Sequence, residues 1–280
     1  MNNPIKTESI EIANSIPVRK MDFPFTTSEI PRYWFGGEML ATHMSNALNM
    51  IFPKGERFFV RSVRHFEPIV TDPTLKEQIK GFYGQEGSHS REHERFFEVL
   101  ESHGIATEKF LKIYQALAYD FLEAKMSPKV NLAVTAALEH FTAMFATGAL
   151  DQGHIEVAHP IMRELLKWHA AEEIEHKAVA FDVLQQVDSR YSLRVTGLVL
   201  AMMTLSGFWI TGTLMLIAQE KKGFRRALLA FVSGVRSREI MDGKMIDAFK
   251  DYWRPDFHPN DVDNRHLAAA YLEKIGRAAA

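Results

Sequence analysis

The chain has no cysteine among its 280 residues. That absence excludes disulfide bonds, zinc ribbons, cysteine-ligated iron–sulfur clusters and thiol nucleophiles. A formal net charge of −2 argues against a surface built for the phosphate backbone, so we expect no nucleic-acid partner. The sequence also has no glycine-rich dinucleotide motif. Any redox chemistry would therefore need electrons from an external donor.

Stretches that alternate apolar and polar residues are almost absent, so we expect no strands. Helical periodicity begins near Gly37, and prolines, glycines and turn residues interrupt it. The predicted helices cover 37–51, 55–70, 74–102, 107–126, 129–150, 160–187, 192–219, 224–240 and 261–278. Residues 1–36 contain scattered prolines and no signal-peptide core, which predicts an extended N-terminal arm of a cytoplasmic protein. Residues 37–280 form a single helical domain in this prediction.

Two short motifs carry metal-ligand chemistry, Glu86-Gly-Ser-His89 and Glu173-Ile-Glu-His176. Residues three apart on a helix lie about 60° from each other around its axis, so each Glu and His pair shares a face. A separate carboxylate precedes each motif, Glu56 before the first and Glu139 before the second. Each spacing fits two antiparallel neighbouring helices joined by a turn, with the carboxylate on one helix and the motif on the next. A four-helix bundle that holds two metal ions needs this alternation of carboxylate and E-x-x-H.

The chain between the two halves contains an additional predicted helix at 107–126, which suits a long crossover connection. We therefore predict an all-α, ferritin-like four-helix bundle with a long crossover and extra C-terminal helices. The position of Glu56, just after Pro53 and Gly55, leaves an alternative open. An acidic residue there could simply favour a helix N-terminus, and Glu38 in the preceding helix is the substitute ligand.

Further candidate ligands lie on the same helical stripes as the two motifs. His169 precedes Glu173 by four positions, and His93 follows His89 by four, so either histidine could add a ligand. A supporting or solvent-facing position is the alternative for both. Glu172 lies beside the second motif, where it could accept a hydrogen bond that orients a histidine ring.

The stripe His169-x-x-x-Glu173-x-x-His176 resembles the last ligand helix of the arylamine N-oxygenases, where a third histidine joins the usual set. The resemblance implies the ligands Glu56, Glu86, His89, Glu139, His169, Glu173 and His176. The bundle pattern predicts two iron ions as cofactors, with manganese or zinc as other candidates. We predict an enzyme that uses O2 to hydroxylate, N-oxygenate or desaturate a small hydrophobic or lipid-like substrate.

Three segments are similar to a bacterial family described as predicted metal-dependent hydrolases, and the similarity runs over about residues 17–270. The segments are Phe52-Pro-Lys-Gly-Glu-Arg-Phe-Phe59, Gln85-Glu-Gly-Ser-His-Ser-Arg-Glu-His93 and Trp168-His-Ala-Ala-Glu-Glu-Ile-Glu-His176. This resemblance implies a metal-dependent enzyme and makes hydrolysis the alternative function. Two metal ions held by the same bundle ligands can activate water as well as O2.

A different hydrolase chemistry would use the literal H-x-x-E-H sequence His89-Ser-Arg-Glu92-His93. In peptidases with that signature, two histidines hold zinc and the glutamate acts as general base. A third ligand would come from Glu172 or Glu173. The known examples have mixed α/β domains, however, and this hypothesis leaves the second E-x-x-H without a role.

One long hydrophobic run is present, since residues 195–218 contain no charged side chain. About 20 residues suffice to cross a bilayer core, although three Gly and five Ser or Thr residues dilute this run. It has three interpretations: a buried extra bundle helix, a monotopic or re-entrant membrane anchor, or a single membrane span. Contact with the inner face of a membrane would favour a lipid-like substrate, and a homodimer is a further candidate assembly.

Overall fold

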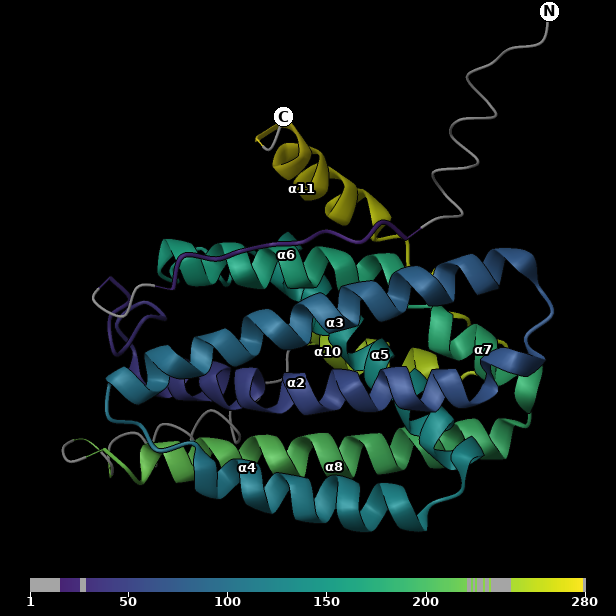
Figure 1. Ribbon diagram of the computed structural model, residues 1–280, viewed down its shortest axis with the longest axis horizontal. Coiled ribbons are helices and arrows are strands. Elements are labelled where there is room, and N and C mark those ends of the chain that lie inside the picture. The colour runs from purple at the N-terminus through teal and green to yellow at the C-terminus, as the bar shows by residue number, and fades with distance from the viewer. Residues whose placement is uncertain are drawn as a thin grey trace, which may run out of the picture.

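The computed structural model describes residues 16–25, 29–220, 223, 225, 229, 232 and 243–278. Long helices dominate these residues (Figure 1), and the only strand-like feature among them is an isolated bridge between Phe35 and Ala158. The predicted all-α fold is confirmed. The predicted helix at 224–240 lies outside the described residues except for three single positions.

Four long helices form the bundle: α2 (Met39–Phe66), α3 (Pro73–Ser102), α5 (Pro128–Asp151) and α6 (Pro160–His176). Helix α2 packs along α3 and α5 packs along α6, and the two pairs meet through α2–α5 and α3–α6 contacts. The side chains of Asp72 and Ser127 accept N–H bonds at the starts of α3 and α5, and a proline begins each helix. These local signals place the ends of two ligand-bearing helices.

The remaining helices surround this bundle: α4 (Glu108–Tyr114), the π-helix η2 (Gln115–Glu123), α7 (Val179–Val187), α8 (Tyr191–Ile217), α10 (Gly243–Tyr252) and α11 (Arg265–Ala278), with short 3-10 turns η1 (Glu67–Ile69) and η3 (Pro259–Asp261). The long crossover between α3 and α5 contains α4 and η2, as predicted. Helix α8 packs against α5 and α2, and α11 packs against α6. In Figure 1, α4 and α8 lie on one side of the bundle and α11 lies on the other.

Two hydrophobic clusters fill the interior, and the polar candidate residues lie where one cluster gives way to the other. Along α2, one cluster ends at Ile51 and the other begins at Phe58. Along α3, the change occurs between Phe82 and Phe96. Glu56 and the first E-x-x-H motif occupy these intervals, so apolar packing on both sides holds the polar residues inside the bundle.

The predicted helix break around Pro53 is wrong, because α2 is one helix from Met39 to Phe66 with Pro53 inside it. A proline in a helix interior costs roughly 3 kcal/mol. Buried residues lie on both sides of it, including Met50 and Phe58, and the helix packs along both α3 and α8. This packing outweighs the local cost and keeps the helix continuous.

The predicted helix at 160–187 is divided, since α6 ends at His176 and α7 begins at Val179. Between them, the buried Lys177 turns toward the C-terminal part of the chain. Its Nζ donates to the carbonyl oxygen of Val262 and to Asn264 Oδ1, each at 2.6 Å. No proline or glycine marks this break, so the local sequence does not predict it. Helix α10 is likewise not predicted from the sequence pattern.

Helix α8 confirms the predicted helix at 192–219 but is not fully buried. By length and composition, it is the one helix among the described residues that is apolar enough to cross a membrane. It has 27 residues, and its most apolar stretch of 18 residues has a mean hydropathy of 1.7 and is 28% buried. Leu198 and Ala201 are buried, whereas Met203 and Ile210 are exposed.

Glycines on α8 offer a matched test of its packing. A Cβ at Gly197 would overlap the backbone carbonyl of Ala133 on α5, whereas a Cβ at Gly207 would meet nothing within 4 Å. We expect Gly197→Ala to lower the free energy of unfolding by about 1–3 kcal/mol through overpacking. Gly207→Ala should instead raise it by about 0.5–1 kcal/mol. Chemical denaturation measures both changes, and equal stability of the two variants would contradict this close packing.

Candidate metal centre

Side chains from all four bundle helices meet in the interior. They are Glu56 on α2, Glu86 and His89 on α3, Glu139 on α5, and His169, Glu173 and His176 on α6. Each of these side chains is buried, with at most 5% of its surface exposed. Glu38, the alternative to Glu56, is exposed at the N-cap of α2. The structure thus brings together the whole predicted set, with Glu56 and not Glu38.

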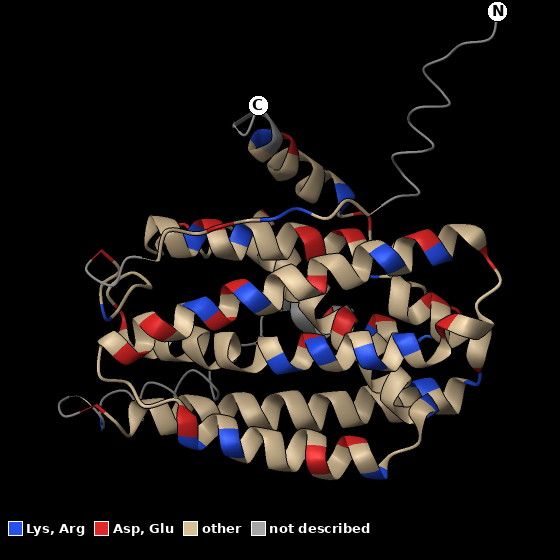
Figure 2. Cartoon of the chain, viewed as in Figure 1, with Lys and Arg blue, Asp and Glu red and all other residues tan. Residues whose placement is uncertain are grey.

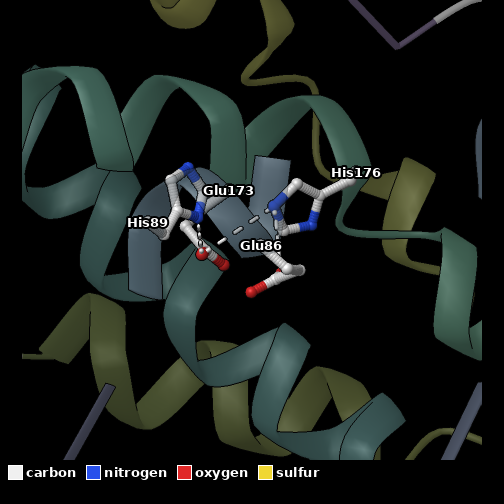
Figure 3. Close-up of side chains that lie close together, drawn as sticks. All are labelled: Glu86, His89, Glu173 and His176. Atoms are coloured by element: carbon white, nitrogen blue, oxygen red, sulfur yellow. Dashed lines mark ion pairs between the residues drawn. The ribbon is translucent and has the colours of Figure 1, made fainter. Parts of the chain in front are cut away.

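Glu173 lies among the histidines of this cluster. Its Oε1 is 2.7 Å from His169 Nε2, 3.6 Å from His89 Nδ1 and 3.8 Å from His176 Nε2. Figure 3 shows its carboxylate directed toward His89, with His176 on the other side. A single carboxylate therefore contacts histidines from two helices.

Two overlapping groups of donor atoms are each compact enough to hold a metal ion. Within each group, one ligand atom per residue lies within 4.8 Å of the others. The groups are Glu86, His89, Glu173 and His176, and Glu56, His89 and His169. Glu139 is adjacent to the first group, because its Oε2 lies 2.9 Å from His176 Nδ1.

Many donor atoms in this cluster have no hydrogen-bond partner among the described residues. They are Glu56 Oε1, both carboxylate oxygens of Glu86, His89 Nδ1, Glu139 Oε1, Glu173 Oε2 and His176 Nε2. Leaving one buried polar atom unpaired costs about 1–3 kcal/mol, so folded proteins rarely concentrate such atoms without a ligand. Carboxylate and imidazole donors suit divalent iron, manganese or zinc. The buried His and Glu groups could therefore hold metal ions.

Three glutamates of the cluster have raised pKa values because they are buried close to other carboxylates. Burial raises the pKa of Glu56 well above its ordinary value, and the neighbouring Glu173 carboxylate raises it further. Burial also raises the pKa of Glu86 well above its ordinary value, and the neighbouring Glu139 carboxylate raises it further. Burial also raises the pKa of Glu139 to about 7, although His176 opposes the shift. Cations at this site would replace the protons that these carboxylates otherwise retain.

The pKa values of His176 and His89 shift in opposite directions because their neighbours differ. Burial lowers the pKa of His176, but Glu139 and Glu173 outweigh burial and raise it to about 9. Burial lowers the pKa of His89 well below its ordinary value, and the neighbouring His169 lowers it further. His89 is therefore neutral at pH 7, which is the form that a metal ligand requires.

His93 and Glu172 lie behind two of the candidate ligands. His93 Nε2 is 2.7 Å from His169 Nδ1, and its Nδ1 is 2.7 Å from Asn49 Oδ1. Glu172 Oε2 is 3.0 Å from His89 Nε2. In metal sites, such partners commonly bind the ring nitrogen that faces away from the metal. His93 and Glu172 thus occupy the positions that such partners of His169 and His89 would have.

Sequence reasoning does not find two polar residues that support the cluster, Asn49 and Ser90. Asn49 is buried against His93, and Ser90 Oγ donates to Glu56 Oε2 at 2.9 Å. Asn49 precedes Glu56 by two helical turns and so shares its face of α2. A polar residue repeated on a buried helix face is the signal that could have identified Asn49.

The position of Glu92 does not support the H-x-x-E-H hypothesis. Its carboxylate accepts hydrogen bonds from Arg91 Nε at 2.9 Å and from Arg95 Nη1 at 2.6 Å. Both ring nitrogens of His93 are also engaged, by Asn49 and His169. Glu92 therefore lies among arginines, where it cannot serve as general base for a zinc ion held by the two histidines of the motif.

An apolar cavity of about 80 Å³ reaches the cluster. Glu56 and Glu173 line it, together with side chains of α2, η2, α5 and α8 that include Phe58, Tyr119 and Phe208. Its predominantly apolar lining is typical of a site for a hydrophobic ligand. The cavity thus joins the candidate metal centre to a space suited to hydrophobic ligands.

The fold and the cluster define an all-α protein with a buried carboxylate and histidine site that could bind metal ions. The chain belongs to the family described as predicted metal-dependent hydrolase, whose model matches residues 17–263. This match confirms the family predicted from the sequence, and the description names a metal-dependent enzyme. No curated protein and no solved structure matches the chain. The resemblance to arylamine N-oxygenases is not shown by these comparisons.

Proposed function

We propose that the chain is a dinuclear non-haem iron enzyme that uses O2 to oxidise a hydrophobic organic substrate. The observation that carries the proposal is the set of unpaired carboxylate and imidazole atoms beside an apolar cavity. Bundles that present carboxylates and two E-x-x-H motifs from four helices hold pairs of iron or manganese ions. Hydroxylation, N-oxygenation and desaturation are the reactions that fit this site.

The ligands divide into two sets around a shared carboxylate. In this proposal Glu56, His89 and His169 would hold one ion, Glu86, Glu139 and His176 would hold the other, and Glu173 lies close enough to both sets to contribute to either. A pair of iron(II) ions supplies electrons to O2 when bound. An external donor must restore those electrons, because the sequence offers no second redox group.

The cavity walls favour a hydrophobic substrate beside the metal centre. Tyr114 and Tyr119 both line the cavity, and their hydroxyls share a hydrogen bond of 2.5 Å. These hydroxyls therefore do not require a polar group on the substrate. Apolar surface buried in such a cavity contributes about 25 cal/mol per Å² to binding, and the same walls exclude bulk water from Glu56 and Glu173.

Hydrolysis at the same two-metal centre is the second candidate function, and the description of the family favours it. Two metal ions can activate a water molecule and stabilise the charge that develops on the substrate. The cavity lining argues against this alternative, since the residues that line it include no lysine, arginine or histidine. A hydrolase would therefore rely on the metal ions alone to stabilise an oxyanion.

Anaerobic loading with iron(II) distinguishes the two functions. We expect the metal-free protein to bind two iron(II) ions per chain and to consume O2 when air is admitted, with a change in the absorbance of the iron. Zinc-loaded protein should bind two ions but show no O2 consumption. Binding of one ion per chain, or hydrolysis by the zinc form that is equally fast with and without O2, would reject the oxygenase.

We also propose that the exposed face of α8 contacts a membrane from which a lipid-like substrate reaches the cavity. Val199, Met203 and Ile210 are 39%, 67% and 42% exposed and recur on one helical face. Figure 2 shows no Lys, Arg, Asp or Glu along most of α8. Phe208 of the same helix lines the cavity.

Vesicle binding tests this contact. Met203→Glu should reduce co-sedimentation with phosphatidylglycerol vesicles by about tenfold or more, because burying a methionine side chain contributes about 1.5–3 kcal/mol. Val157→Glu is the matched control, since Val157 is 62% exposed but belongs to the loop before α6. Equal vesicle binding by both variants, or a change in self-association alone, would contradict the membrane contact. The cytoplasmic location stays a prediction.

A further inference from the structure

The segment formed by residues 16–25, which we call the strap, lies across α3 and α6 on the outside of the bundle. Figure 1 shows it as the purple trace beside these two helices. Arg91 Nη2 donates to the carbonyl of Met21 at 2.7 Å, and Arg95 Nη2 donates to the carbonyl of Phe23 at 3.0 Å. The ring of Phe23 lies 5.6 Å from that of Trp168 on α6. The strap is therefore attached to both helices that carry E-x-x-H motifs.

Two glycines on α3 allow the strap to approach the helix closely. A Cβ at Gly81 would overlap the backbone carbonyl of Ile16, and a Cβ at Gly84 would overlap the side chain of Val18. These glycines lie about one helical turn apart and so on the same face. Side chains at these positions would hold the strap away from α3.

Arg19 of the strap is connected to His89 through one buried carboxylate. Arg19 Nη1 donates to Glu172 Oε1 at 3.1 Å, and Glu172 Oε2 lies 3.0 Å from His89 Nε2. Glu175 holds the same guanidinium with two hydrogen bonds of 2.6 and 3.0 Å. Gln85 in turn donates to Glu175 at 2.8 Å. The guanidinium is thus fixed between two carboxylates of α6.

We propose that Arg19 is a positioning residue for the metal centre. By holding Glu172, it orients the His89 ring so that Nε2–H donates to Glu172 and Nδ1 is directed at the metal ion. His89 Nδ1 is one of the unpaired buried atoms and lies 3.6 Å from Glu173 Oε1. This inference rests on the proposed metal centre and adds to it a residue from outside the bundle. Removing supports of this kind typically weakens metal binding 10–100-fold.

Titration of the metal-free protein with cobalt(II), followed by the visible absorbance of the bound ion, tests the proposal. Arg19→Gln should weaken binding of one of the two ions roughly tenfold or more. Lys20→Gln is the matched control, because Lys20 is exposed on the same strap and carries the same charge. It should leave both affinities within about twofold, as expected for a surface substitution. Gly81→Ala should reproduce the effect of Arg19→Gln by lifting the strap.

A double-mutant cycle separates positioning from a general effect on folding. If Arg19 acts through Glu172, then Arg19→Gln should have little further effect on cobalt(II) affinity in protein that already carries Glu172→Gln. An equal effect in both backgrounds would overturn the proposal, as would wild-type affinity in Arg19→Gln or a similar loss in Lys20→Gln. Wild-type protein that binds fewer than two ions would instead contradict the proposed function. Thermal unfolding of each variant verifies that the protein is folded.

Discussion

Protein carrying Glu173→Gln should lose affinity for both metal ions. The carboxylate of Glu173 contacts His169, His89 and His176, so its charge serves both groups of donor atoms. Glutamine keeps the size of the side chain but removes that charge. We expect each ion to bind at least about 100-fold more weakly, which is the upper end of the loss seen for supporting residues. Metal analysis after dialysis and cobalt(II) titration measure the change.

Glu164→Gln is the control for this experiment, because Glu164 belongs to the same helix but lies outside the cluster. Its Oε2 accepts a hydrogen bond from the hydroxyl of Tyr271 at 3.0 Å. It should retain two ions per chain. A single weakened ion in Glu173→Gln would show that Glu173 serves only one group. Undiminished binding of both ions would remove Glu173 from the ligands and leave the two-metal centre without its shared carboxylate.

Removal of the metal ions should destabilise the protein, and by more at pH 8 than at pH 5.5. A ligand at 100 times its Kd stabilises the folded state by about 2.7 kcal/mol. For a chain of this size, that corresponds to a fall in Tm of roughly 5–10 °C. The buried carboxylates explain both the loss and its pH dependence, because without cations they must either stay protonated or bury negative charge.

The direction of the pH effect follows from the raised pKa of Glu139, about 7 in the fold against 4.5 for an ordinary glutamate. Between these values the folded protein holds more protons than the unfolded chain. The contribution of Glu139 to metal-free stability is therefore full below pH 4.5 and is lost as the pH rises through 7. Metal binding displaces these protons and strengthens over the same range. His89 is neutral with and without metal, so it cancels in the comparison.

Differential scanning calorimetry at pH 5.5 and pH 8, with and without a chelator, measures this effect. The difference in Tm between metal-loaded and metal-free protein should be the larger one at pH 8. A difference that is equal at both pH values, or larger at pH 5.5, would mean that the glutamates are not the groups that bind the cations. The test does not depend on which reaction the centre performs.

The spacing of the two E-x-x-H motifs and the separate carboxylates predicts the residues of the candidate site, because helical period decides which side chains share a face. Helical periodicity cannot tell which residues on one helical face contact a metal ion and which do not. His93 and His169 both lie on ligand stripes, but His93 contacts Asn49 and His169, whereas His169 contacts the carboxylate of Glu173. The choice of Glu56 over Glu38 likewise follows from burial inside the bundle, which depends on the neighbouring helices.

The sequence by itself determined the all-α class, the helices that carry the candidate ligands and the residue types that meet there. These features follow from local rules, namely helical period, N-terminal caps and the spacing of charged residues along one helix. The tertiary structure alone decided that α2 continues through Pro53, that α6 ends before Lys177 and that Arg19 reaches Glu172. Each of these depends on contacts between residues far apart in the chain, and such contacts leave no periodic signal in the sequence.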